Sequence, residues 1–154
     1  MAGGARSIGL GSDDAGAALR AALRRHLGEE RGLEVVDYGT DEADPAYPEI
    51  ARTVAERVAD GTHERAILIC GTGIGVSIAA NKVPGVFAAL CHDTYSARRA
   101  RKSNDAQVLT MGARVIGTAL ALEITDAWLE SEFEGGRSAP KVESLRGLDR
   151  QRHA

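Results

Sequence analysis

Ala66-Ile67-Leu68-Ile69-Cys70 leads directly into Gly71-Thr72-Gly73-Ile74-Gly75. The apolar run is typical of a strand buried on both faces of a parallel sheet, and the glycines that follow predict a tight turn. A helix is expected next, over residues 76–82. This stretch therefore predicts one strand–turn–helix unit.

The same succession recurs on both sides of this stretch. Apolar runs predict further strands at residues 7–12, 33–37, 86–90 and 107–110. Apolar residues at helical spacing predict helices over residues 19–27, 50–58, 95–102 and 120–128. Five strands that alternate with helices predict an α/β fold, a three-layer α/β/α sandwich around a five-stranded parallel sheet. In such sheets ligands bind at the carboxyl ends of the strands.

Length and composition restrict the class of protein. The 154 residues, 44% hydrophobic and 27% charged, predict one globular domain over residues 1–154, with a charged C-terminal tail from about residue 137. A net charge of −3 provides no positive field for a nucleic acid. No apolar stretch is long enough for a bilayer span or a signal peptide, so we expect a cytoplasmic protein with no membrane partner. Cys70 and Cys91 are expected to be reduced thiols.

The glycine-rich turn is the strongest candidate for a functional site. Its backbone N–H groups can converge on an anion at the helix N-terminus, and the same field favours a thiolate at Cys70 over a thiol. Cys70 therefore lies where a nucleophile or general base would act. The alternative is a tight turn beside an inert cysteine, since free cysteine is among the most buried residue types. The loop matches neither a Walker motif nor GxGxxG.

Polar side chains near two other strands are weaker candidates. Asp13 and Asp14 follow the first strand, where they either face a ligand or cap the next helix, and the local sequence favours capping. Asn104 precedes the fifth strand. Its amide could point into the same cleft, but a loop-forming asparagine is the default interpretation.

The remaining candidates are cations and histidines. Arg114, Arg137 and Lys141 are suited to binding a phosphate, although each is also typical of a solvated surface. The basic run at residues 98–102 indicates a solvated helix face on an acidic protein. The four histidines show no metal-ligand spacing, so no metal is expected, and His92 receives no role.

Together these motifs resemble the family of type B ribose-5-phosphate isomerases and galactose-6-phosphate isomerases. The resemblance extends from about Ile8 to Lys141 and keeps the family order. It rests on Gly11-Ser12-Asp13, Asp37-Tyr38-Gly39-Thr40, Tyr47-Pro48, residues 69–75 and 77–82, Asn104-Asp105 and Glu134-Gly135-Gly136-Arg137. It implies a Rossmann-like sheet and an aldose–ketose isomerase of small phosphorylated sugars that uses no metal or cofactor. It also implies a homodimer, with tetramers left open, whose active sites lie between subunits.

The resemblance assigns roles to individual residues. Cys70 is the implied base that moves a proton between C1 and C2 of the open-chain sugar, and Thr72 assists proton movement among the oxygens. The enediolate is implied to be held by Gly71, Gly73, Ile74, Gly75 and Asn104. The resemblance also implies that Asp13 and Tyr47 contact the sugar, with Asp13 as one of the catalytic residues. The phosphate is implied to be held, from the same or the partner subunit, by Arg114, Arg137 and Lys141.

Three positions depart from the family pattern. Asp14, Ser103 and Ser138 stand where the family has histidines, and the histidine at the position of Ser103 is credited with opening the sugar ring. A serine does not replace that function alone, and Asp14 would repel a phosphate. We therefore expect Asp14 and Ser103 to meet the substrate in a different arrangement.

The missing ring-opening histidine bears on the substrate. A tetrose 4-phosphate carries its phosphate on the oxygen that would close a five-membered ring, so it needs no ring opening. Erythrose 4-phosphate therefore rivals ribose 5-phosphate, the family default. A non-catalytic sugar-phosphate-binding subunit is a further alternative, opposed by the presence of Cys70, Thr72 and the loop glycines. A flavodoxin-like nucleotide or flavin binder would share only the architecture, which does not specify function.

Overall fold

The chain forms a five-stranded parallel sheet with helices on both faces. The computed structural model describes residues 7–39 and 46–152, so Thr40 of the Asp37-Tyr38-Gly39-Thr40 motif lies outside the described residues. The strands follow the order β2-β1-β3-β5-β4, with bounds β1 Ser7–Ser12, β2 Val35–Asp37, β3 His63–Cys70, β4 Ala88–Leu90 and β5 Val108–Gly112. The predicted α/β fold is confirmed.

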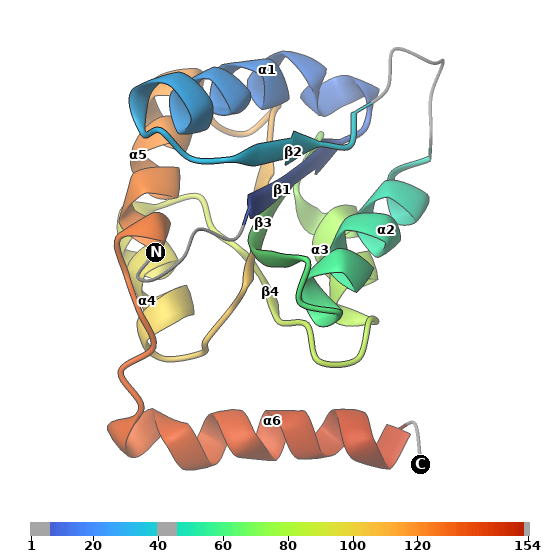
Figure 1. Ribbon diagram of the computed structural model, residues 1–154, viewed down its shortest axis with the longest axis vertical. Helices are drawn as coiled ribbons and strands as arrows, with labels where there is room; N and C mark the ends of the chain where they lie inside the picture. Colours follow the sequence, from blue (N-terminus) through green and yellow to red (C-terminus); the bar gives the residue numbers. More distant parts are fainter. Residues whose placement is uncertain (1–6, 40–45, 153–154) are drawn as a thin grey trace.

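The helices form two layers around this sheet (Figure 1). One face is covered by α1 Ala17–Arg25, α4 Thr94–Lys102 and α5 Thr118–Leu129. The other face is covered by α2 Tyr47–Ala59 and α3 Ile74–Asn81. Strand β3 contributes Ile67 and Ile69 to the first core and Leu68 to the second. This alternation explains why its sequence is continuously apolar.

The edge strands are shorter than their apolar runs. β2 covers Val35–Asp37 and β4 covers Ala88–Leu90, and their residues are only partly buried or, at Leu90, exposed, whereas every residue of β5 is buried. Helix α3 begins at Ile74, within the glycine-rich turn, two residues before the expected start. Helix α2 begins at Tyr47 because Pro48 is well accommodated in the first helical turn.

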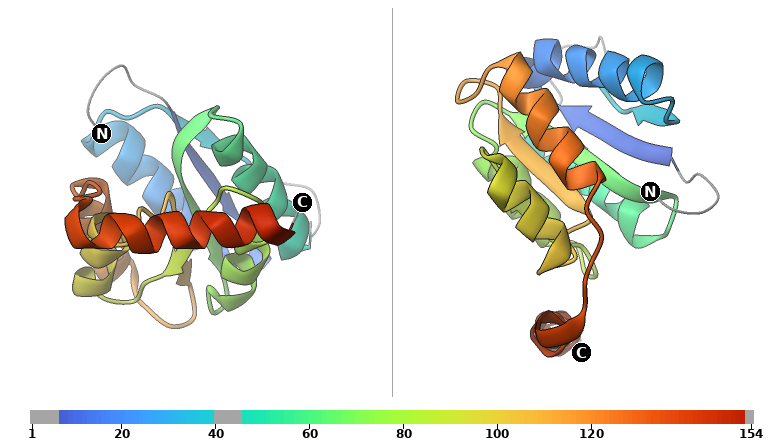
Figure 2. Two further views of the ribbon diagram at one scale, coloured as in Figure 1. Left: turned by 90° about the horizontal axis from the view of Figure 1, so that it is seen from below. Right: turned by 90° about the vertical axis from the view of Figure 1, so that its left-hand side faces the viewer.

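Helix α6, Ala139–Arg152, stands apart from both layers and crosses beneath the amino ends of β4 and β5 (Figures 1 and 2). A short 3-10 turn, η3 Gly136–Ser138, precedes it. The predicted charged tail is thus largely helical. Leu145 and Leu148 of α6 are 40% and 59% exposed, so an apolar part of this helix faces outward. No helix among the described residues is both long enough and apolar enough to span a membrane.

Arg65, near the amino end of β3, is buried, which its charge did not predict. Its side chain is fully buried and donates hydrogen bonds to the carbonyl oxygens of Trp128, Leu129 and Ser131 at 2.9–3.0 Å. Its guanidinium also lies over the Trp128 ring, 5.4 Å from the centroid. Since the last carbonyls of a helix lack partners within the helix, Arg65 satisfies the C-terminus of α5.

Helix α1 continues into a π-helical turn, η2 His26–Glu30, that is joined to α5. His26 Nε2 lies 2.7 Å from Asp126, and His26 Nδ1 lies 2.8 Å from Glu30. Arg31 donates to the same Asp126 carboxylate at 3.1 Å. Burial lowers the pKa of His26, but the hydrogen bonds to Asp126 and Glu30 outweigh it, and the net pKa is raised.

We predict that this contact makes the free energy of unfolding depend on pH. Because the pKa of His26 is higher in the folded chain, its contribution is complete below about pH 6.5, the unfolded value, and is lost as pH rises through the folded pKa. Urea unfolding of wild type and His26→Gln between about pH 5 and about pH 9 measures it. The wild-type advantage should shrink toward high pH. The buried His63, whose pKa is lowered by burial, acts in the opposite sense but is common to both proteins.

Candidate active site

The glycine-rich turn lies at the carboxyl end of β3 and forms the start of α3. Gly73, the residue before α3, has φ 80°, a left-handed conformation that favours glycine. Its N–H group donates to Cys70 Sγ at 3.1 Å. The N–H of Ile74 donates to Thr72 Oγ1 at 3.2 Å. Cys70 is 5% exposed, while Ile74 is 55% exposed at the mouth of the turn.

The end of β5 holds this turn in place. Ala113 N–H donates to the Cys70 carbonyl at 2.9 Å, and Arg114 N–H donates to the Gly71 carbonyl at 3.0 Å. A methyl group at Gly73 would lie 2.7 Å from the Met111 carbonyl carbon, a contact that real side chains essentially never make. The turn and the strand end are therefore in direct backbone contact. The same pairing places the exposed Arg114 beside the turn, as the sequence predicts for a phosphate-binding cation.

Two further predicted residues lie around the turn. Tyr47, at the start of α2, packs over Gly75 so closely that a methyl group there would lie 2.5 Å from its ring. Asp13 follows β1, and its carboxylate accepts from Gly16 N–H at 3.2 Å, so it caps the short 3-10 turn η1 Asp14–Gly16. Asp14 is exposed and makes no side-chain cap. The capping alternative thus describes Asp13, which still lies at the carboxyl edge of the sheet.

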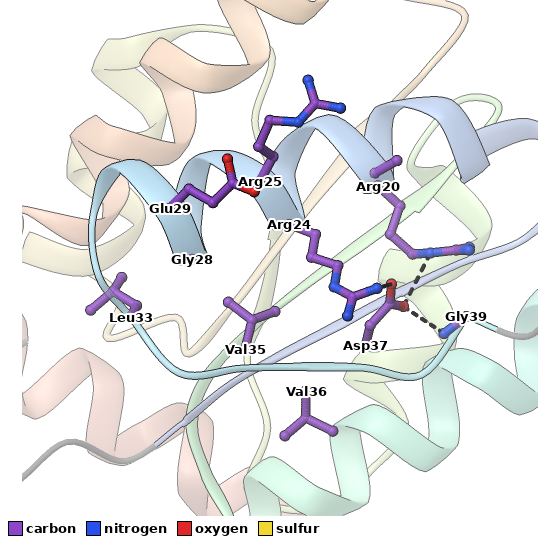
Figure 3. A pocket seen from close by; sticks show the side chains of 11 residues that line it. Arg20, Arg24, Arg25, Gly28, Glu29, Leu33, Val35, Val36, Asp37 and Gly39 are labelled. Atoms are coloured by element: carbon purple, nitrogen blue, oxygen red, sulfur yellow. Dashed lines mark hydrogen bonds and ion pairs between the residues drawn. The ribbon is translucent and has the colours of Figure 1, made fainter.

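Arg20 of α1 links the ends of β1 and β2, a contact that sequence reasoning missed; its pairing with Asp37 is drawn in Figure 3. Its guanidinium donates to Ser12 Oγ and pairs with Asp37 at 3.1 Å. Asp37 in turn accepts from Gly39 N–H at 2.8 Å. The adjoining hollow of about 950 Å³, lined by α1 and β2, contains none of the predicted site residues. We therefore assign this cluster to support of the strand ends.

His92 and Cys91 lie next to each other but differ in surroundings. His92 Nε2 accepts from Gly112 N–H at 2.9 Å, which places the imidazole at the end of β5 beside the glycine-rich turn. Burial, with a smaller effect of Asp93, raises the pKa of Cys91 to about 11. Cys91 is therefore a protonated thiol near neutral pH and is unsuited to act as a base.

Ser103 and Asn104 lie in a turn at the opposite edge of the sheet, so Asn104 does not share the cleft of Cys70 within one chain, and the default interpretation of a loop-forming asparagine describes its local structure. Both follow α4 and precede β5, whereas Cys70 pairs with Gly112 at the far end of β5. The two ends of β5 are about 13 Å apart along the strand. The physical reason is simple: a residue before a strand lies at its amino end. Ser103 Oγ accepts a hydrogen bond from Arg99, and Asn104 is exposed.

Arg137 and Lys141 lie on the same side of the molecule as Asn104. Arg137 is in η3 and Lys141 in the first turn of α6, and both are exposed. The segment that leads to them is attached to the end of α4, where Glu134 N–H donates to the Lys102 carbonyl at 3.2 Å. The predicted site residues of one chain therefore form two groups, a carboxyl-edge group around Cys70 and an amino-edge group around Asn104.

Neither group is built as a metal site. Within residues 7–39 and 46–152, no cluster of three or more His, Cys, Asp or Glu side chains is placed to hold a metal ion. The carboxyl-edge group instead brings together, in one turn, the thiol of Cys70, the hydroxyl of Thr72 and the backbone N–H groups of the glycine-rich stretch. Such a set suits proton transfer next to a stabilised oxyanion.

Comparison with known proteins identifies the family. The sequence profile described as Ribose/Galactose Isomerase matches residues 8–145. A D-erythrulose-4-phosphate isomerase of Pectobacterium atrosepticum is 56% identical, over 90% of this chain and 92% of the relative. A ribose-5-P isomerase B of Listeria innocua is 48% identical, over 94% and 97%. The ribose-5-phosphate isomerase B structure of Clostridium thermocellum superposes with a TM-score of 0.91 and 46% identity, over 95% and 99%.

The chain belongs to the Ribose/Galactose Isomerase family. The predicted family and the predicted isomerase class are thereby confirmed. The roles of single residues remain predictions, and the geometry above determines how each can be tested.

We predict that Gly73→Ala reduces isomerase activity by at least about 10²-fold, because the turn must move away from the Met111 backbone and its donors lose their alignment. Gly61→Ala is the matched control. Gly61 also has a positive φ, 84°, but nothing lies within 4 Å of the added methyl group. Both variants place alanine at a positive φ and so share the same kind of backbone strain. Thermal unfolding measures the loss of stability from this strain, and steady-state kinetics measures the loss of activity from displacement of the turn. Equal activities for the two variants would contradict the assigned role of the turn.

Proposed function

We propose that this enzyme interconverts D-erythrulose 4-phosphate and D-erythrose 4-phosphate. The observation that carries the substrate is Ser103, which accepts a hydrogen bond from Arg99 where the family pattern has an imidazole. A tetrose 4-phosphate needs no ring opening, so the loss of that imidazole is harmless for it. The 56% identical relative, named for the ketose of this pair, supports the same substrate.

The reaction moves one proton between two carbons. Cys70, acting as the base, removes a proton from C1 of the ketose and returns it to C2. The hydroxyl proton passes from O1 to O2 in the same sequence, with Thr72 within reach of the oxygens. A positioned base of this kind contributes about 10²–10⁴-fold to the rate. The result is the aldose, with no net change in protons.

The enediolate between the two steps needs donors that are already in place. The N–H groups of residues 71–75 are aimed by the contacts of the turn with β5, and each preorganised donor contributes about 10²–10³-fold. The N–H of Gly73 is already directed at Cys70 Sγ. Tyr47 and Asp13 border the same turn and are assigned to the sugar hydroxyls.

The complete site requires a second copy of the chain. The carboxyl-edge group holds the base and Arg114, whereas Asn104, Arg137 and Lys141 lie at the amino edge. A homodimer in which the amino edge of one subunit meets the carboxyl edge of the other brings the groups together twice, by symmetry. Ile74 and Ile78 near the turn, each 55% exposed, and the outward leucines of α6 supply apolar surface for such an interface.

Ribose 5-phosphate is the second candidate substrate. The Listeria innocua relative, 48% identical, carries the name of a ribose-5-P isomerase. His92 beside the glycine-rich turn is a group that could act on a closed ring in place of the missing imidazole. A pentose could also react through its small open-chain fraction.

The first experiment follows deuterium uptake by NMR in D₂O, with erythrose 4-phosphate and ribose 5-phosphate in parallel. We expect faster uptake beside the carbonyl, and faster ketose formation, with the tetrose. Cys70→Ala should lower exchange by about 10²–10⁴-fold because the base is removed. Cys91→Ala should leave the rate unchanged, since the high pKa of Cys91 keeps it protonated.

The outcomes separate the candidates. Equal or faster exchange with the pentose would replace the proposed substrate by ribose 5-phosphate. Exchange that survives Cys70→Ala would assign the proton transfer to another group. Phosphate binding without exchange of either sugar would identify a binding subunit.

Mixed dimers test the shared site. Cys70→Ala and Asn104→Ala/Arg137→Gln chains should each be nearly inactive alone. After unfolding and refolding together in equal amounts, half of the dimers are mixed and each holds one intact site, so about a quarter of wild-type activity should return. No recovery, although mixed dimers are shown by mass spectrometry of tagged chains, would place all site residues within one subunit.

A further inference from the structure

A continuous series of ion pairs crosses the amino edge of the sheet and ends on α6. It begins at the buried Arg65, whose Nη2 lies 2.7 Å from Glu132. Glu132 lies 3.7 Å from Arg101, and Arg101 lies 3.3 Å from Asp105. Asp105 pairs with Arg146 of α6 at 2.8 Å. Arg65 and Arg101 expose 0% and 8% of their side chains, so the series is anchored in the core and not only at the surface.

Asp105 is the unusual member of this series. Among residues 7–39 and 46–152 it alone, apart from glycines, has a positive φ, at 53°. Its N–H donates to the Arg101 carbonyl at 3.1 Å, and its carboxylate lies between Arg101 and Arg146. Aspartate tolerates the left-handed conformation better than most residues, but strained backbone persists only where surrounding contacts hold it. These contacts fix the peptide that joins Asp105 to Asn104.

The ion pair between Asp105 and Arg146 also holds α6 to the rest of the chain, together with two further contacts. The Arg146 guanidinium lies 6.0 Å from the centroid of the Phe87 ring, and Asp149 accepts from Gly85 N–H at 2.9 Å. Helix α6 otherwise stands away from the layers, as Figure 2 shows. The position of α6 relative to Asn104 is therefore determined by Arg146 and Asp149 together with Val142, which is only 1% exposed.

We propose that Asp105, with Arg146, is a positioning element that holds Asn104 and the cations Arg137 and Lys141 as one rigid unit for presentation to the other subunit. This inference rests on the proposed function, which assigns Asn104 to the enediolate and the cations to the phosphate. Those groups must act on two ends of one small molecule. A displacement of about 1 Å between them costs as much as about 10²-fold in rate.

Arg146→Gln tests the α6 side of the unit. It removes the pair with Asp105 but leaves Asn104 and its backbone in place. We expect the KM for the tetrose phosphate and the inhibition constant of inorganic phosphate each to rise by about tenfold, with kcat changed much less. Arg150→Gln is the matched control, since Arg150 pairs with Glu143 on α6 itself at 2.8 Å and carries the same charge. It should leave all three constants unchanged.

Asp105→Asn tests the other side of the unit. Asparagine keeps the size and tolerates the positive φ, but it loses the charge that holds Arg101 and Arg146. We expect kcat to fall together with a rise in KM, because Asn104 and the cations are loosened at once. Arg146→Lys should recover part of the phosphate affinity, since it restores a cation without the two-pronged geometry of arginine.

Three results would overturn the proposal. The first is that Arg146→Gln and Arg150→Gln give the same kinetic constants. The second is that sedimentation shows the Arg146→Gln dimer to dissociate and that this dissociation accounts for the whole loss of activity. The third is that kcat falls while phosphate affinity stays unchanged. If Asp105→Asn does not fold, the two Arg146 variants still decide the question. If the wild type exchanges neither sugar, the proposed function fails, and calorimetric phosphate binding by the Arg146 and Arg150 variants still tests the unit separately.

Discussion

The parallel pairing of β3 with β5 is the constraint on which the site depends. Its register places Cys70 beside Gly112, and the backbone of the glycine-rich turn then rests directly on the end of β5. No side chain fits between them: a methyl group at Gly112 would lie 2.6 Å from the Thr72 backbone. The turn is therefore shaped by main-chain contacts, which are stiffer than contacts through flexible side chains. This stiffness is what an array of N–H donors needs in order to stabilise a developing charge without reorganisation.

A parallel sheet also has two unlike edges, and this geometry divides the predicted site. Residues that follow a strand meet at the carboxyl edge, and residues that precede one meet at the opposite edge. The sequence motif Asn104-Asp105 precedes β5, so no local rearrangement brings it to Cys70. In the proposed homodimer this separation is useful, because each amino edge can cover the other subunit's turn. The detached α6 is consistent with this arrangement, since a helix held by few contacts to its own body leaves surface for a neighbour.

Much of the fold could be predicted from sequence, and the failures have physical causes. The apolar runs and helical spacings locate the sheet and its covering helices, because burial on two faces leaves a clear pattern in β3. Arg65 escaped prediction because a charge in a strand normally indicates an exposed position, and only the structure shows the free carbonyls of α5 that it satisfies. The edge of the sheet on which Asn104 lies was available from its place before the strand. The roles of Arg20 and Asp105 were not, since they depend on Asp37 and Arg146, which lie on other elements and come close only in the fold.

The division of the site also explains how a family of this kind can change its substrate without changing its chemistry. In the proposed function, proton transfer depends on the turn at Cys70, where the β3–β5 contacts leave no room for a side chain at Gly73 or Gly112. Recognition of the sugar's length depends, in the proposed function, on residues 103–104 and on the tail, which belong to different elements. Ser103 and Arg99 are side chains one helical turn apart, and replacing them disturbs no backbone contact of the turn. In the proposed homodimer, the distance between the two groups depends on the subunit interface and on the anchoring of α6. A shorter substrate then requires changes mainly at the amino edge, where Ser103 and Ser138 depart from the family pattern, while Asp14 is the one departure at the carboxyl edge.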